Sequence, residues 1–121
     1  MSLKTATRIV QRVAASQTQR VQADICVVGA GISGISAAVE AARLGRKVVL
    51  IDGLPALGGQ AVNSLIGTFC GLFSNGPDPY QFTHGIADGI LKDLEAKGAL
   101  NYRWGGDWTT VMYDEVALSR W

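Results

Sequence analysis

The sequence predicts an α/β fold, a partial doubly wound parallel sheet entered through an N-terminal strand–helix–strand unit. Two unbroken apolar runs, 25–28 and 48–51, are typical of parallel strands that are covered on both faces. Between them, residues 32–44 carry apolar side chains at helical spacing and polar side chains on the other side. Two such strands joined through a helix require a right-handed parallel crossover. Cys26 lies inside the first run, so we expect it in the core.

Length and charge narrow the class of protein. The 121 residues suffice for one small domain, and the net charge of +1 carries no signature of nucleic-acid or membrane binding. No apolar run approaches the roughly 20 residues of a membrane span. Two cysteines that are far apart predict neither a disulfide framework nor a metal site, so we expect a reducing, cytoplasmic location.

The chain divides at about residue 23. Residues 1–22 hold basic side chains and no acid, which predicts an exposed basic N-terminal arm, with a transit peptide as the alternative. The α/β domain occupies 23–121, where a glycine- and proline-rich stretch, 53–79, is expected to be a functional loop.

The second half of the domain alternates between helix and strand signals. Asp78 followed by Pro79 predicts the start of a helix that ends before Gly98. Extended segments are expected at 100–104 and 108–113, separated by a glycine turn, because apolar and polar residues alternate in the first of them. Asp114 then predicts the N-cap of a last helix. No breaker or polar tail closes that helix, so we expect the domain to be incomplete in this chain.

The strongest chemical signal is the G-x-G-x-x-G turn between the first strand and the helix. Gly29 permits the tight turn, Gly31 lets the backbone approach a pyrophosphate, and Gly34 lets the helix lie close to the strand. The free N–H groups at the start of the helix favour a diphosphate. Asp52 ends the second strand, where its carboxylate can accept hydrogen bonds from the hydroxyls of an adenosine ribose. These features predict a dinucleotide site, with a purely structural turn as the alternative.

The chain resembles the FAD-dependent oxidoreductases that have a glutathione-reductase-like, Rossmann-type flavin domain. The segments that match are Val27-Val-Gly-Ala-Gly-Ile-Ser-Gly-Ile-Ser-Ala-Ala38, Leu50-Ile-Asp52 and, most tellingly, Leu57-Gly-Gly-Gln60. Weaker likenesses at 85–94 and 113–118 extend the resemblance to the end of the chain.

The resemblance implies FAD as the cofactor and a set of cofactor-binding residues, whereas the catalytic residues stay unknown and no metal site is expected. The implied residues are Gly29, Gly31, Ile32, Ser33 and Gly34 at the pyrophosphate, Asp52 and Gly53 at the ribose, and Gly58, Gly59 and Gln60 at the pyrophosphate or ring system. The function implied is FAD binding as the N-terminal portion or small subunit of an oxidoreductase that transfers hydride from a small-molecule substrate. A second polypeptide or a missing C-terminal region would complete the flavin domain. Two alternatives remain open: an NAD-linked dehydrogenase domain, and a non-catalytic fragment or interaction subunit that kept the βαβ unit.

Other reactive side chains have plainer interpretations. Cys70 has no basic neighbour or second thiol nearby in the sequence, so a buried inert thiol is expected rather than a redox residue. His84 is expected to have a surface or packing role, because no partner for a catalytic base can be named. Three tryptophans are expected either in the core or on a surface that awaits a partner, namely Trp104, Trp108 and Trp121.

Overall fold

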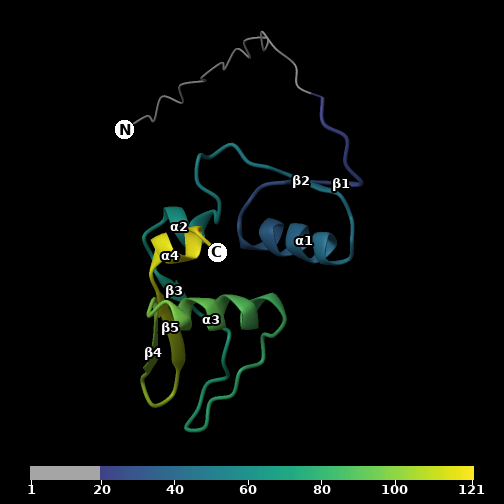
Figure 1. The fold of residues 1–121 in the computed structure, drawn as a ribbon. Coiled ribbons are helices and arrows are strands. Elements are labelled where there is room, and N and C mark those ends of the chain that lie inside the picture. Colours follow the sequence, from purple (N-terminus) through teal and green to yellow (C-terminus); the bar gives the residue numbers. More distant parts are fainter. Residues whose placement is uncertain (1–19) are drawn as a thin grey trace, which may run out of the picture.

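The predicted βαβ unit is present in the computed structural model, which describes residues 20–121 (Figure 1). Strands β1 (Ile25–Val28) and β2 (Val48–Ile51) form a two-stranded parallel sheet, and α1 (Ile32–Arg43) connects them. Ile25 lies opposite Val48, and Val28 lies opposite Ile51. The α/β fold class and the parallel N-terminal unit are therefore confirmed.

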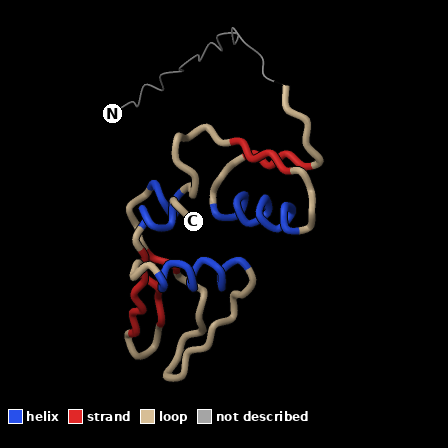
Figure 2. The backbone as a smooth tube through the Cα atoms, viewed as in Figure 1, coloured by secondary structure: helices blue, strands red, loops and turns tan. Residues whose placement is uncertain are grey.

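The expectation that both faces of this sheet are covered is wrong for the described part of the chain. Figure 2 shows α1 along one side of the two strands. Val28 is 80% exposed and Ile51 is 49% exposed, and Cys26, predicted to be a core residue, is also exposed. Cys26, Val49 and Ile51 line a shallow hollow on the open face. Apolar side chains are more stable when they are buried, which is why the pattern predicted a covered face. In the described chain, however, no element lies over this face of the sheet.

The second half of the chain forms a separate antiparallel sheet. Its strands run in the order β3 (Thr68–Phe69), β5 (Thr109–Tyr113) and β4 (Leu100–Trp104). The extended segments predicted at 100–104 and 108–113 are confirmed, and they pair as a hairpin. The stretch predicted as loop, 53–79, contains β3 and the short helix α2 (Gln60–Asn63), because pairing with β5 and packing on the core stabilise segments that have no strong local signal.

The core of the chain lies in this second half. Helices α3 (Ile86–Ala96) and α4 (Glu115–Ser119) supply Ile90, Leu94 and Leu118, which pack with Tyr113 of β5. The predicted N-cap of the last helix is confirmed, since the carboxylate of Asp114 accepts a hydrogen bond of 2.7 Å from the N–H of Ala117.

The predicted start of the longer helix at Asp78 is wrong. Helix α3 begins after Gly85, whose φ of +81° is incompatible with a continuous helix through this point, and the carboxylate of Asp88 accepts the Gly85 N–H at 2.8 Å. The segment before it runs back on itself, as the bond from the N–H of Ser74 to the carbonyl of Tyr80 shows (2.8 Å). These cross-loop bonds use backbone groups that a helix would need for itself.

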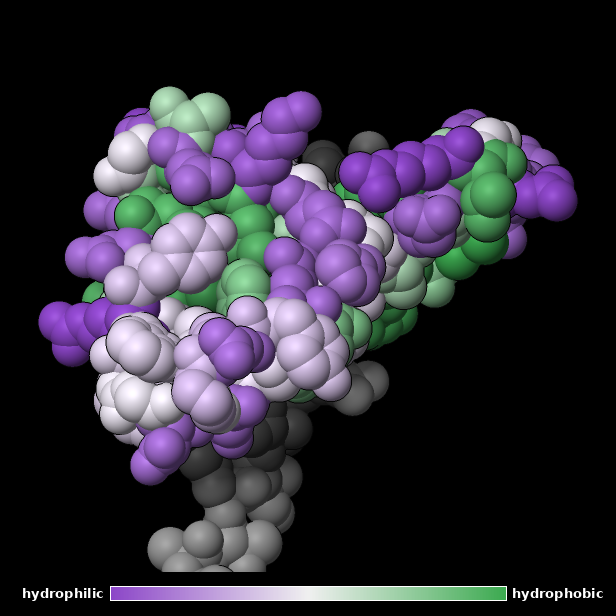
Figure 3. All heavy atoms as spheres, turned by 90° about the horizontal axis from the view of Figure 1, so that it is seen from below, coloured by the Kyte–Doolittle hydropathy of each residue, from purple (hydrophilic) through white to green (hydrophobic). Residues whose placement is uncertain are grey.

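Aromatic side chains gather on the surface near the β4–β5 hairpin. In Figure 3, which views the molecule from below, large pale side chains cover much of the body that carries this hairpin. Trp104 is 62% exposed and Trp108 is 47% exposed, so both lie on the surface rather than in the core. Within residues 20–121, no helix has the length and apolar character needed to cross a membrane.

Candidate functional site

The glycine turn links the end of β1 to the start of α1. The N–H of Gly29 donates to the carbonyl of Ile51 at 2.7 Å, which ties the turn to the end of β2. The first helical bond of α1 runs from the N–H of Ile35 to the carbonyl of Gly31 (2.9 Å). Among residues 20–121, the N–H groups of Ser33 and Gly34 have no backbone acceptor. They are free donors at the positive end of the helix dipole.

Gly34 allows α1 to lie directly against this turn. A Cβ atom built at Gly34 would overlap the carbonyl oxygen of Gly29, and it would also reach the side chain of Val27 at 3.4 Å. The carbonyl group of Gly29 therefore occupies the space that any side chain at Gly34 would need.

The second glycine pair, Gly58 and Gly59, packs on the first turn. The N–H of Gly58 donates to the carbonyl of Ala30 at 2.7 Å. A Cβ atom at Gly59, whose φ is +55°, would lie 2.8 Å from the Cα of Gly31. Two segments separated along the chain by α1 and β2 thus meet through their backbones.

These two turns border an open groove of about 510 Å³. Most of the predicted cofactor-binding residues line it: Gly29, Gly31, Ile32, Ser33, Gly34, Gly58 and Gln60. Two further lining residues, Val28 and Ala61, were not predicted. The predicted residues Asp52, Gly53 and Gly59 are not part of this lining. The groove has the donors and the close backbone approach that a diphosphate requires.

The carboxylate of Asp52 clamps the glycine turn from the β2 side. Its Oδ2 accepts the N–H of Ala30 at 2.5 Å, and its Oδ1 accepts the N–H of Leu54 at 2.7 Å. These hydrogen bonds, first that from Ala30 and then that from Leu54, lower the pKa of Asp52 below its ordinary value. A carboxylate has about four lone-pair sites, so both oxygens can still accept further donors. The spacing of the acid predicted its place but not this structural role.

Asn63 is a supporting residue that the sequence did not reveal. Its side-chain amide donates to the carbonyl of Gly59 at 3.0 Å and also lies 3.5 Å from the carbonyl of Ala56. It therefore holds the end of α2 against the loop that carries Gly58 and Gly59. An amide four residues after a glycine is the only local signal for this contact, and it is too common to be diagnostic.

The two other candidate residues lie away from the groove lining. Cys70 is exposed, so the prediction of a buried thiol is wrong, because the chain leaves β3 for the surface at this residue. No group of three or more potential metal ligands occurs in the described part of the chain.

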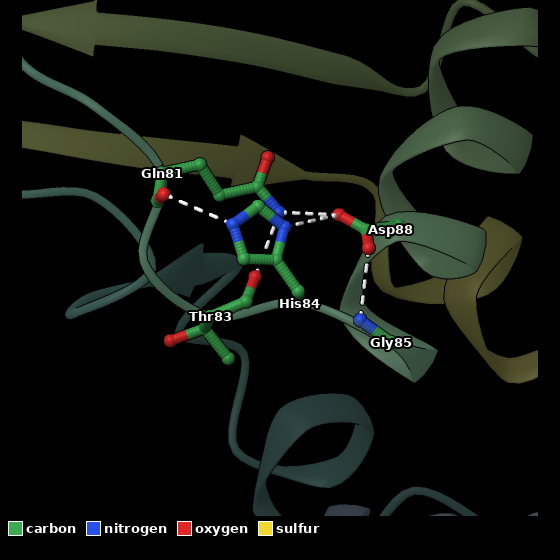
Figure 4. Close-up of polar contacts among 5 residues, drawn as sticks. All are labelled: Gln81, Thr83, His84, Gly85 and Asp88. Atoms are coloured by element: carbon green, nitrogen blue, oxygen red, sulfur yellow. Dashed lines mark hydrogen bonds and ion pairs between the residues drawn. The ribbon is translucent and has the colours of Figure 1, made fainter.

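His84 lies at the surface, as predicted, and it has partners that the sequence could not name (Figure 4). Its Nδ1 lies 3.2 Å from a carboxylate oxygen of Asp88, and its Nε2 lies 3.1 Å from the carbonyl of Gln81. The Asp88 carboxylate also accepts the N–H of Gly85, and this bond is the main cause of the lowered pKa of Asp88, followed by the bond with His84. The cluster closes the N-terminal end of α3.

Comparison with protein families matches residues 24–120 to the FAD dependent oxidoreductases. This chain belongs to that family. The match covers both the glycine turn and the Gly58–Gly59 turn that packs on it, so the family assignment and the geometry concern the same residues. No solved structure gives a significant match.

Two curated relatives of this family member match over shorter segments. A protein named "Probable oxidoreductase OrdL" from Haemophilus influenzae is 40% identical over 70 residues, which are 52% of this chain and 14% of that protein. A dihydrolipoyl dehydrogenase from Manduca sexta is 51% identical over 41 residues, which are 34% of this chain and 8% of that protein. The chain thus spans a small part of the length of these relatives.

Proposed function

We propose that this chain binds FAD in the groove between the two glycine turns, as the N-terminal portion or small subunit of an FAD-dependent oxidoreductase. The observation that carries the proposal is the backbone contact between Gly58 and Ala30, with a 2.7 Å hydrogen bond. It brings the loop that the resemblance assigns to the flavin against the turn assigned to the pyrophosphate. A purely structural βαβ turn has no need of this second glycine pair.

Each group of residues has a definite part in this proposal. The N–H groups of Ser33 and Gly34, which have no backbone acceptor among residues 20–121, donate to the diphosphate, and the dipole of α1 favours its negative charge. Asp52, with Gly53 beside it, accepts hydrogen bonds from the ribose hydroxyls while its carboxylate keeps the turn in place. Gln60 lines the groove on the side of α2. Bound FAD supplies the capacity to take up hydride, and the chain's own residues bind and orient it.

The proposal includes a further polypeptide region that covers the open face of the β1–β2 sheet. Val28 and Ile51 are apolar and largely exposed on the described chain, and a parallel sheet is normally covered on both faces. That region, either a second polypeptide or later sequence, contributes the site for a small-molecule substrate. A cytoplasmic location belongs to the same proposal and rests on the free thiols of Cys26 and Cys70.

A titration of the purified chain with FAD tests the proposal. We expect saturable binding, detected by the change in flavin fluorescence, and weaker or no binding of NADH. The Asp52→Ala variant should lose about tenfold or more in FAD affinity, since hydrogen bonds to a charged group are removed. Asp107→Ala is the matched control, because Asp107 is an exposed acid in the β4–β5 turn.

Three results would contradict the proposal. Absence of FAD binding by the wild-type chain removes the cofactor assignment, and NADH binding with no FAD binding favours a nicotinamide site. Unchanged FAD affinity in Asp52→Ala removes the ribose assignment. Unfolding midpoints of both variants separate loss of the cofactor contact from damage to the turn.

A further inference from the structure

Tyr113 connects the core of the chain to the wall of the groove. Its side chain is 7% exposed, and its ring stacks on Phe69 with the centroids 4.1 Å apart. The phenol hydroxyl donates to the carbonyl of Ala61 at 2.7 Å. On the backbone side, the N–H of Tyr113 donates to the carbonyl of Gly67 at 2.9 Å. Both ends of this residue are therefore fixed.

Ala61 belongs to the segment that lines the groove. Helix α2 begins at Gln60, directly after the glycine pair, and both Gln60 and Ala61 line the groove. At its N-terminal end this segment is fixed to the first turn by the bond from Gly58 to Ala30. Tyr113 fixes the same segment three residues further along, through the carbonyl of Ala61.

The hydroxyl provides a directional contact that apolar packing on this helix does not. Ala61 and Val62 also pack against the core cluster, but such contacts tolerate small rotations of a four-residue helix. A hydrogen bond of 2.7 Å to a backbone carbonyl fixes both the distance and the direction. A tyrosine hydroxyl is protonated at neutral pH and can donate, and burial, followed by the negative charge of Glu115, raises the pKa of Tyr113 further.

We propose that Tyr113 is a positioning residue for the cofactor. Its hydroxyl holds α2 against the glycine turn through the carbonyl of Ala61. This inference rests on the proposed function, since it concerns the same groove. It assigns a cofactor-related part to a side chain that does not itself line the groove.

The Tyr113→Phe variant isolates the hydroxyl. The ring and its stacking on Phe69 remain, and only the bond to Ala61 is lost. We expect FAD affinity to fall by up to about tenfold, the most that loss of one hydrogen bond can cost when that bond holds α2 in its binding position. Affinity for adenosine should stay unchanged, because the proposed ribose contacts belong to the end of β2. Tyr102→Phe is the matched control, since Tyr102 lies on the neighbouring strand β4 and is 47% exposed.

Amide hydrogen exchange of the full chain without ligand supplies a second measurement. Tyr113→Phe should speed exchange in α2 and leave α3 unchanged, which a general loss of stability would not do. Equal losses of FAD and adenosine affinity, or unchanged exchange in α2, would overturn the inference. If the wild-type chain binds FAD and Tyr113→Phe binds it equally well, only this inference fails. If the wild-type chain does not bind FAD, the proposed function fails, and the inference fails with it.

Discussion

Replacing Gly34 by alanine tests the packing of the glycine turn most directly. The added methyl group would overlap the carbonyl oxygen of Gly29, so either the turn or the first turn of α1 must move. The obstacle is the backbone carbonyl of Gly29, which cannot give way by a change of rotamer.

The magnitude follows from two opposing effects. Alanine in place of glycine in a helix interior gains up to about 1 kcal/mol of unfolding free energy through helix propensity. Forcing a methyl group into filled space costs about 1–3 kcal/mol. Since the overlap at Gly34 is with fixed backbone, we take the upper part of that range and expect a net loss of about 1–2 kcal/mol. This corresponds to a fall in Tm of roughly 4–8 °C per kcal/mol for a domain of this size.

Gly89→Ala is the matched control in the same measurement. Gly89 lies inside α3, and a Cβ atom there would meet only the ring of Trp121 at 3.6 Å, an ordinary contact. This variant should therefore be as stable as the wild type or more stable by up to about 1 kcal/mol. Urea unfolding followed by circular dichroism gives both values. If Gly34→Ala were as stable as Gly89→Ala, the close approach of α1 to the turn would not exist in solution.

Three further predictions concern the rest of the described chain. The lowered pKa of Asp88 means that its contribution to stability is present above its ordinary pKa of 3.8 and is lost as the pH falls further. Acid unfolding curves should therefore show a smaller loss of unfolding free energy below about pH 4 in Asp88→Asn than in the wild type. Equal slopes would contradict the carboxylate contacts. Asp114→Ala removes an N-cap and should lower the unfolding free energy by about 0.5–2 kcal/mol, whereas Asp114→Asn should retain most of it. A thiol reagent should modify both Cys26 and Cys70 in the native chain; a thiol that reacts only after denaturant is added would show that its surface is covered.

Local residue patterns were sufficient to predict the elements whose signals lie within the element itself. The 25–51 unit was predictable because strand and helix periodicities alternate there and glycines occupy the turn. Asp114 was recognisable as an N-cap because aspartate is preferred at that position. The start of α3 was not predictable, because Asp78 and Pro79 provide a good local start signal while the actual start at Gly85 depends on Asp88 and on a loop that folds back on itself. Burial of Cys26 was predicted from the apolar run around it, and burial of Cys70 from the lack of a basic neighbour or second thiol. Both predictions are wrong, since exposure depends on which element covers a surface.

The sequence by itself determined that a G-x-G-x-x-G turn, an acid at Asp52 and a later glycine pair occur at spacings typical of a flavin domain. Only the tertiary structure decided that the glycine pair packs on the first turn, that Asp52 holds the N–H of Ala30, and that Tyr113 reaches α2. Periodicity and spacing report the conformation of neighbouring residues. Contacts between segments that lie far apart depend on how the elements pack, and a single sequence does not state that packing.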